Sequence, residues 1–184
     1  SLFEGSMYIF VFNWTPAMSS ASPTTPPFGR IFACFMVACM GGSSAFAWLS
    51  RFYSAEMILR SVFLVASAAL ALPIFFKSTG VLLFSFLVFE ACVGVYWPAI
   101  GTVKSRVVPE SARATMYNIF RVPLNAVVLG VLLNQMEVCM AFFWCTLMLA
   151  VSFGAMVLLM AYPANGGGLD VEGGDQALVA LREP

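Results

Sequence analysis

Three polar side chains in the apolar segment 114–135 have the chemistry to bind an oxyanion. Asn118, Arg121 and Asn125 are three and four residues apart, so on a helix they fall within about 60° of one another. A guanidinium is planar and permanently charged, and it can hold two oxygens of a tetrahedral anion at once. We interpret Arg121 as the candidate anion ligand and the two asparagines as candidate hydrogen-bond donors.

Two glutamates in other apolar segments provide opposite charge. Glu90 lies about ten residues beyond Gly80, roughly 15 Å into the membrane and close to its midplane. Glu4 shares a helix face with Tyr8 and precedes Pro16 by twelve residues, so it also lies within the apolar segment. Charged side chains at membrane depth usually face a bundle interior or a water-filled cavity. Glu90, Glu4 and Tyr8 therefore join the candidate site.

Two interpretations of these charges remain open. In the first, Arg121 forms a buried ion pair with Glu90 or Glu4 that only fixes how the helices pack. In the second, the polar faces form a pathway for a hydrophilic solute, with Arg121 binding an anion and a glutamate serving as its counter-charge or as a proton carrier. The two are compatible, because a paired arginine can exchange its partner for substrate.

Small residues mark positions where helices are expected to approach closely. Gly94, Pro98 and Gly101 share the face of Glu90, at a spacing that favours close contact between helix backbones. The run 41–44, Gly-Gly-Ser-Ser, is typical of the same kind of packing.

The composition indicates a polytopic membrane protein. Of 184 residues, 61% are hydrophobic and 10% are charged, whereas soluble domains carry roughly 25% charged and 45–50% apolar residues. A membrane-spanning helix needs about 20 apolar residues. Six segments meet this requirement and predict an all-α membrane protein with six transmembrane helices: 1–20, 28–50, 57–76, 81–103, 114–135 and 138–162.

Basic residues predict which ends of these helices face the cytoplasm. The loops after the second and fourth segments, with their edges, carry Arg51, Arg60, Lys104, Arg106 and Arg113. The opposite side carries Lys77 and Arg30, so the positive-inside rule places the first set in the cytoplasm. Residues 164–184 are Gly-rich and acidic with a net charge of −3, and we expect them to form a disordered cytoplasmic tail.

Several functional classes are disfavoured. The sequence has no histidine, which excludes a Ser-His-Asp triad and an HExxH zinc site within this chain. Its five cysteines lie in apolar stretches without paired spacing, which argues against a disulfide framework or a zinc site. No basic run suggests nucleic acid. We predict a protein that is not an enzyme, has no cofactor or metal, and works in a lipid bilayer.

Two stretches resemble a known family. "LFEGSMYIFVFNWTPA" (Leu2–Ala17) resembles the seventh helix of the molybdate-anion transporter family, a branch of the major facilitator superfamily. "FEACVGVYWPAIGTVKSRVVPESARATMYNIFRVPLN" (Phe89–Asn125) resembles its tenth and eleventh helices. One departure is Phe46, which stands after Gly42 where a common superfamily loop motif has an acidic residue.

The resemblance implies that residues 1–163 are helices seven to twelve of a twelve-helix transporter. The chain opens at Ser1 within an apolar pattern, so we expect a piece of a longer protein whose N-terminal six-helix half is the missing partner. The implied activity is uptake of molybdate across the cell membrane by alternating access. Transport of another solute, such as a sugar, an organic anion or sulfate, remains an alternative. So does a membrane scaffold or sensor that does not transport; a membrane enzyme has less support.

Overall fold

A computed structural model of the protein describes residues 2–107 and 137–161, together with residues 119, 122, 126, 129 and 130. The regular elements over these residues are the helices α1 (Leu2–Ala21), α2 (Phe28–Leu49), α3 (Ala55–Phe75), α4 (Thr79–Val107) and α6 (Val138–Ala161). The all-α prediction is confirmed. Most of the predicted fifth segment, 114–135, lies outside the described residues, so the count of six helices and the half-transporter architecture stay predictions.

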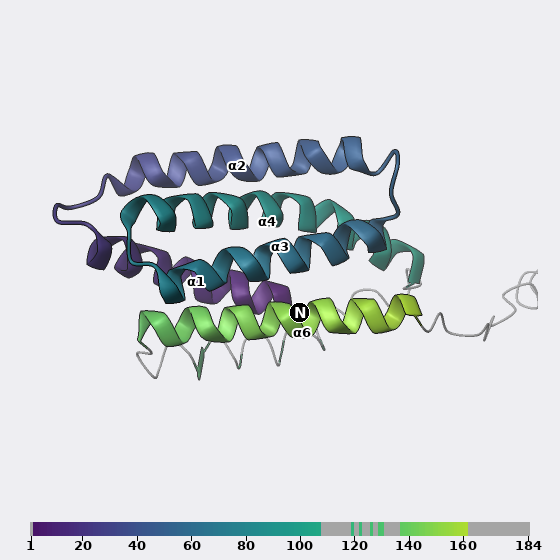
Figure 1. The fold of residues 1–184 in the computed structure, drawn as a ribbon. Helices are drawn as coiled ribbons and strands as arrows, with labels where there is room; N and C mark the ends of the chain where they lie inside the picture. The colour runs from purple at the N-terminus through teal and green to yellow at the C-terminus, as the bar shows by residue number, and fades with distance from the viewer. Residues whose placement is uncertain are drawn as a thin grey trace, which may run out of the picture.

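The described helices lie side by side in a bundle with α4 in the middle of one layer (Figure 1). α2 and α3 both pack against α4, and α6 packs against α1 and α3. α4 is longer than the predicted segment 81–103, and it continues to Val107. Lys104 and Arg106 therefore belong to the last turns of a helix, and assigning them to a loop was wrong.

Among the described helices, α2, α3, α4 and α6 are long and apolar enough to cross a membrane, and α1 is not. α1 carries Glu4, Asn13 and Pro16 within 20 residues, which lowers its hydropathy. Its face with Phe3, Ile9 and other apolar residues is buried against the other helices.

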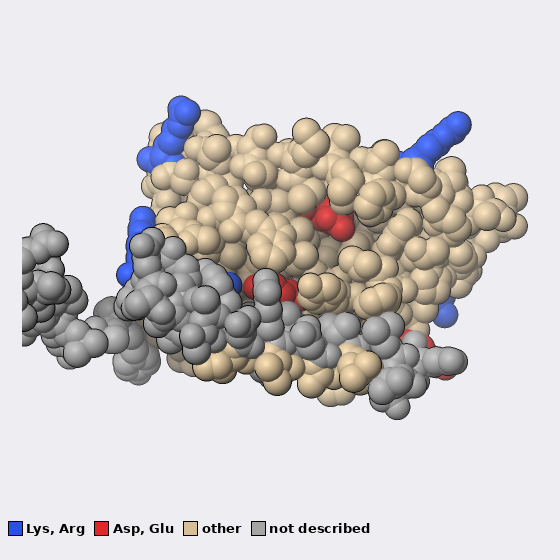
Figure 2. Space-filling view, turned by 180° about the vertical axis from the view of Figure 1, so that it is seen from behind, with Lys and Arg blue, Asp and Glu red and all other residues tan. Residues whose placement is uncertain are grey.

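Figure 2 shows Lys and Arg side chains toward the two ends of the molecule, with acidic atoms between them on a largely uncharged face.

Two glycines bring α2 and α4 into close contact. A Cβ atom added at Gly42 would overlap the carbonyl oxygen of Ala91, and one added at Gly94 would overlap the carbonyl oxygen of Cys39. Backbones this close gain van der Waals contact along both helices. The predicted packing role is confirmed for Gly42 and Gly94. It was wrong for Gly101 as far as the described residues go, because none of their atoms lies within 4 Å of a Cβ added there.

Aromatic side chains hold α1 against the layer. The Phe10 ring lies 4.9 Å from Phe89 and 5.2 Å from Phe86, both on α4, and 6.0 Å from Phe35 on α2 (distances between ring centroids). Tilted and edge-on aromatic pairs of this kind are favourable beyond the area they bury. They fix α1 beside the middle of α4, where Glu90 lies.

Candidate functional site

The carboxylate of Glu4 joins α1 to two positions on α4. The Tyr96 hydroxyl donates a hydrogen bond to Glu4 Oε1 at 3.1 Å, and Lys104 Nζ lies 3.8 Å from the same oxygen. The Glu4 and Lys104 side chains are 17% and 32% exposed, so this ion pair is partly desolvated and is screened less than a surface pair.

Aromatic packing sets the position of the Tyr96 hydroxyl. The Tyr96 ring stacks on Phe3 with centroids 4.1 Å apart and planes at 20°, and it also contacts Phe63 of α3 at 6.3 Å. Tyr96 itself is 2% exposed. Since Phe3 and Glu4 are neighbours on α1, one turn of that helix both clamps the tyrosine ring and accepts its hydrogen bond.

Glu90 lies in the middle of the bundle and differs from Glu4 in its partners. It is 8% exposed. No described side chain forms an ion pair or hydrogen bond with it. Its neighbours in sequence pack on two helices, because Phe89 contacts Phe10 of α1 and the Ala91 carbonyl meets Gly42 of α2. A nearly buried carboxylate without a partner is costly unless it is neutralised or engaged by another group.

The other predicted site residues have different outcomes. Tyr8 is 47% exposed, and no hydrogen bond joins it to another described residue. Asn118, Arg121 and Asn125 lie outside the described residues, so their common face and any pair between Arg121 and a glutamate stay predictions. The structure thus places Glu4 in the first turn of α1 and Glu90 on the neighbouring helix α4, while the anion ligand lies outside the described residues.

Tyr96 and Lys104 were not predicted as site residues. Lys104 was counted as a loop charge, whereas its long side chain reaches Glu4 from within α4. A signal was available in the sequence, because residues eight apart on a helix lie about 80° apart and share a side. That spacing places a phenol and an ammonium group on the same side of α4.

A second ion pair joins α4 to α3 at the same end of the bundle. Arg106 Nη1 lies 3.6 Å from Glu56 Oε1, with side chains 62% and 27% exposed. Exposed pairs of this kind contribute little to stability, so we assign it no part in binding. Within the described ranges, no cluster of His, Cys, Asp or Glu side chains could hold a metal ion.

Comparison with known proteins identifies the family. A family model of the major facilitator superfamily, described as sugar transporters with 12 transmembrane segments, matches residues 1–92, half of the chain. The chain belongs to this family. It is therefore a multi-pass membrane protein of the major facilitator superfamily, and the family resemblance inferred from the two quoted stretches is confirmed. No solved structure matches.

Several curated relatives in this superfamily are similar to the chain. A molybdate-anion transporter of Takifugu rubripes is 31% identical over 94% of this chain and 40% of its own length. Those of Danio rerio and Xenopus tropicalis are 36% and 35% identical over 75% and 68% of this chain. These matches span 30% and 29% of the two relatives. The chain thus spans less than half the length of the curated relatives it matches.

Proposed function

We propose that the protein carrying this chain takes up molybdate into the cell by alternating access. The observation that carries this proposal is the likeness to molybdate-anion transporters, which extends over 94% of the chain in one relative. Residues 1–163 would form helices seven to twelve, and an N-terminal six-helix half would complete the cavity. Residues 164–184 would lie in the cytoplasm, on the side of Arg51 and Arg60, with the protein in the cell membrane.

In this proposal Arg121 binds the oxyanion, and Asn118 and Asn125 donate hydrogen bonds to it. Glu90 is the counter-charge of Arg121 in the empty state or the carrier of a coupling proton. Its near-complete burial without a described partner supports this role.

Glu4 serves a different purpose, because Tyr96 and Lys104 already engage its carboxylate. The Lys104 ammonium, paired with Glu4, would add a second positive charge to that of Arg121 near the end of α4. Tyr8, which is half-exposed on α1, would offer its hydroxyl to the anion along the same pathway through the protein.

The test is accumulation of molybdate in cells that lack their own uptake system and express the full-length parent. We compare the parent with Arg121→Ala and with Arg106→Ala at equal surface levels. Arg106 is a matched control, because it is an arginine at the exposed end of α4. A further arm adds excess sulfate, which has the same charge and shape as molybdate.

We expect uptake by the parent, resistance to sulfate, loss with Arg121→Ala and near-normal uptake with Arg106→Ala. A parent that accumulates no molybdate overturns the proposed substrate. Full uptake by Arg121→Ala would instead make Arg121 a packing residue and move the anion site elsewhere.

Sugar uptake is the second candidate, because the description of the matching family model names sugars. An uncharged sugar needs hydrogen-bonding groups but no fixed positive charge. A parallel assay with radiolabelled hexoses therefore separates the two. Hexose uptake that survives Arg121→Ala, without molybdate uptake, would favour the sugar assignment.

A further inference from the structure

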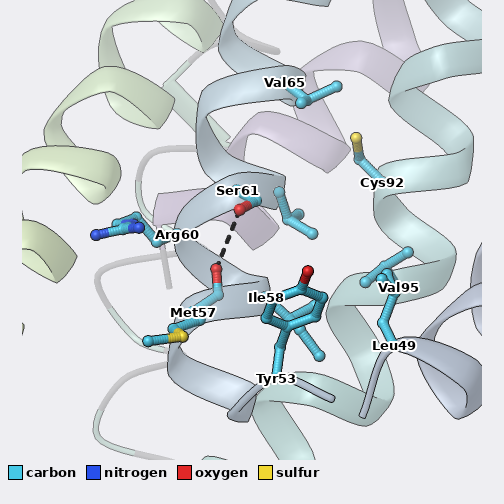
Figure 3. A pocket seen from close by; sticks show the side chains of 10 residues that line it. Leu49, Tyr53, Met57, Ile58, Arg60, Ser61, Val65, Cys92 and Val95 are labelled. Atoms are coloured by element: carbon cyan, nitrogen blue, oxygen red, sulfur yellow. Dashed lines mark hydrogen bonds between the residues drawn. The ribbon is translucent and has the colours of Figure 1, made fainter. Parts of the chain in front are cut away.

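A hollow of about 330 Å³ lies where α2 and α3 diverge over α4 (Figure 3). It arises because α2 and α3 both pack on α4 rather than on each other. Its walls include Tyr53 after α2, Met57 and Val65 of α3, and Cys92 and Val95 of α4. Most of these side chains are apolar.

A second hollow of about 370 Å³ begins at Val65, which also lines the first hollow, and continues between α3 and α4. It is lined by Ala68 and Leu72 of α3 and by Phe84 and Val88 of α4. Residues 57, 61, 65, 68 and 72 recur at helical spacing, so one face of α3 lines both hollows. From residue 57 to residue 72 the combined groove follows α3 for about 22 Å, which exceeds one half of the roughly 30 Å hydrocarbon layer.

The groove is polar at one end only. Figure 3 shows the Tyr53 hydroxyl pointing into the first hollow and Arg60 extending from its rim, on the side of α3 away from Val95. Ser61 donates its hydroxyl to the Met57 carbonyl at 3.2 Å. In the second hollow the hydroxyl of Ser85 donates to the Ala69 carbonyl at 2.6 Å, so it is already satisfied.

The polar end also carries an excess of positive charge. Of the described acids near it, Glu56 is held by Arg106 and Glu4 by Lys104. Arg51 and Arg60 are exposed, and neither forms an ion pair with another described residue.

We propose that this groove binds one anionic phospholipid. An acyl chain would lie along Val65, Ala68 and Leu72, with the phosphate at the Tyr53 hydroxyl, and the long Arg60 side chain would turn from the rim of the hollow toward that phosphate. Basic residues at the end of an apolar cleft between membrane helices suit an anionic headgroup, and a zwitterionic lipid gains less there. The groove shares no lining residue with Glu4, Tyr96 or Lys104, and the proposal does not depend on the transported solute.

The experiment is native mass spectrometry of the purified full-length protein with equimolar phosphatidylserine and phosphatidylcholine of identical chains. Arg60→Gln removes the charge and Val65→Trp fills the groove. The matched controls are Arg30→Gln, an exposed arginine at the start of α2, and Val151→Trp, a 52% exposed valine on α6. A monodisperse elution profile checks folding, and Ala68→Leu replaces Val65→Trp if that variant aggregates.

We expect preferential retention of phosphatidylserine, a loss of about fivefold with Arg60→Gln, and loss of both lipids with Val65→Trp. Both controls should retain lipid as the parent does. Equal retention of the two lipids by the parent overturns the headgroup assignment. An Arg30→Gln effect as large as that of Arg60→Gln, or retained lipid in both groove-filling variants, overturns the site.

Discussion

The Tyr96 hydroxyl donates a 3.1 Å hydrogen bond to Oε1 of Glu4 and so joins α4 to α1. The same oxygen lies 3.8 Å from Lys104 Nζ. One carboxylate therefore connects two turns of α4, and the tyrosine that donates to it is held by stacking on Phe3.

Removing this hydroxyl tests the connection. Tyr96→Phe keeps the ring stack and removes the donor. We expect a coupling free energy of about 1–2 kcal/mol between Tyr96→Phe and Glu4→Ala, which removes the acceptor, in a double-mutant cycle of unfolding. Tyr8→Phe is the control, since no hydrogen bond joins the Tyr8 hydroxyl to another described residue. Strictly additive effects of the two substitutions would mean that the bond contributes nothing to stability.

Neutralising Glu90 should separate stability from transport. Glu90→Gln preserves shape and removes the charged form of a side chain that is 8% exposed. We expect a large loss of solute uptake in either role. Thermal stability should fall if Glu90 pairs with Arg121, because the arginine then loses its partner, and it should stay equal or rise if Glu90 is an unpaired proton carrier. Glu56→Gln, at the surface pair with Arg106, should change both by little. A Glu90→Gln variant with normal uptake would remove Glu90 from the proposed site.

Substituting alanine at two glycines of α4 should change the free energy of unfolding in opposite directions. At Gly94 a Cβ overlaps the Cys39 backbone, so we expect Gly94→Ala to cost about 1–3 kcal/mol of unfolding free energy. At Gly101 nothing lies within 4 Å of an added Cβ. Gly101→Ala should be neutral or stabilising by up to about 1 kcal/mol, because alanine is the better helix former. Chemical unfolding in matched micelles measures both, and equal effects would contradict the close α2–α4 contact.

Removing the Phe3 ring should lower the stability of the protein more than removing the ring of an exposed phenylalanine on the same helix. Phe3 is 2% exposed and contacts Tyr96, Phe63 and Phe89, so Phe3→Ala should cost about 3 kcal/mol or more by leaving a cavity. Phe12 is 45% exposed, and Phe12→Ala should cost far less. Thermal unfolding of the two variants gives the comparison. Similar melting temperatures would show that the aromatic clamp on Tyr96 is not rigid.

The membrane character and the approximate bounds of α1, α2, α3 and α6 could be predicted from the sequence. These follow from local hydropathy and from breakers such as Pro26 and Pro27, which act within a few residues along the chain. The C-terminal end of α4 was placed too early, because Lys104 and Arg106 read as loop charges although their long side chains are tolerated on a helix end.

The pairing of polar groups on different helices could not be predicted in this way, because it depends on the tertiary fold. The sequence predicted that Glu4 and Glu90 lie in the membrane, but it gave both the same possible partner, Arg121. The fold assigns Tyr96 and Lys104 to Glu4 and leaves Glu90 without a partner among the described residues. It also separates Gly94 from Gly101, which share a helix face but meet different surroundings. Hydropathy is a property of a single segment of the chain. A hydrogen bond or ion pair between helices depends on which faces of the two helices meet and on how closely their backbones approach.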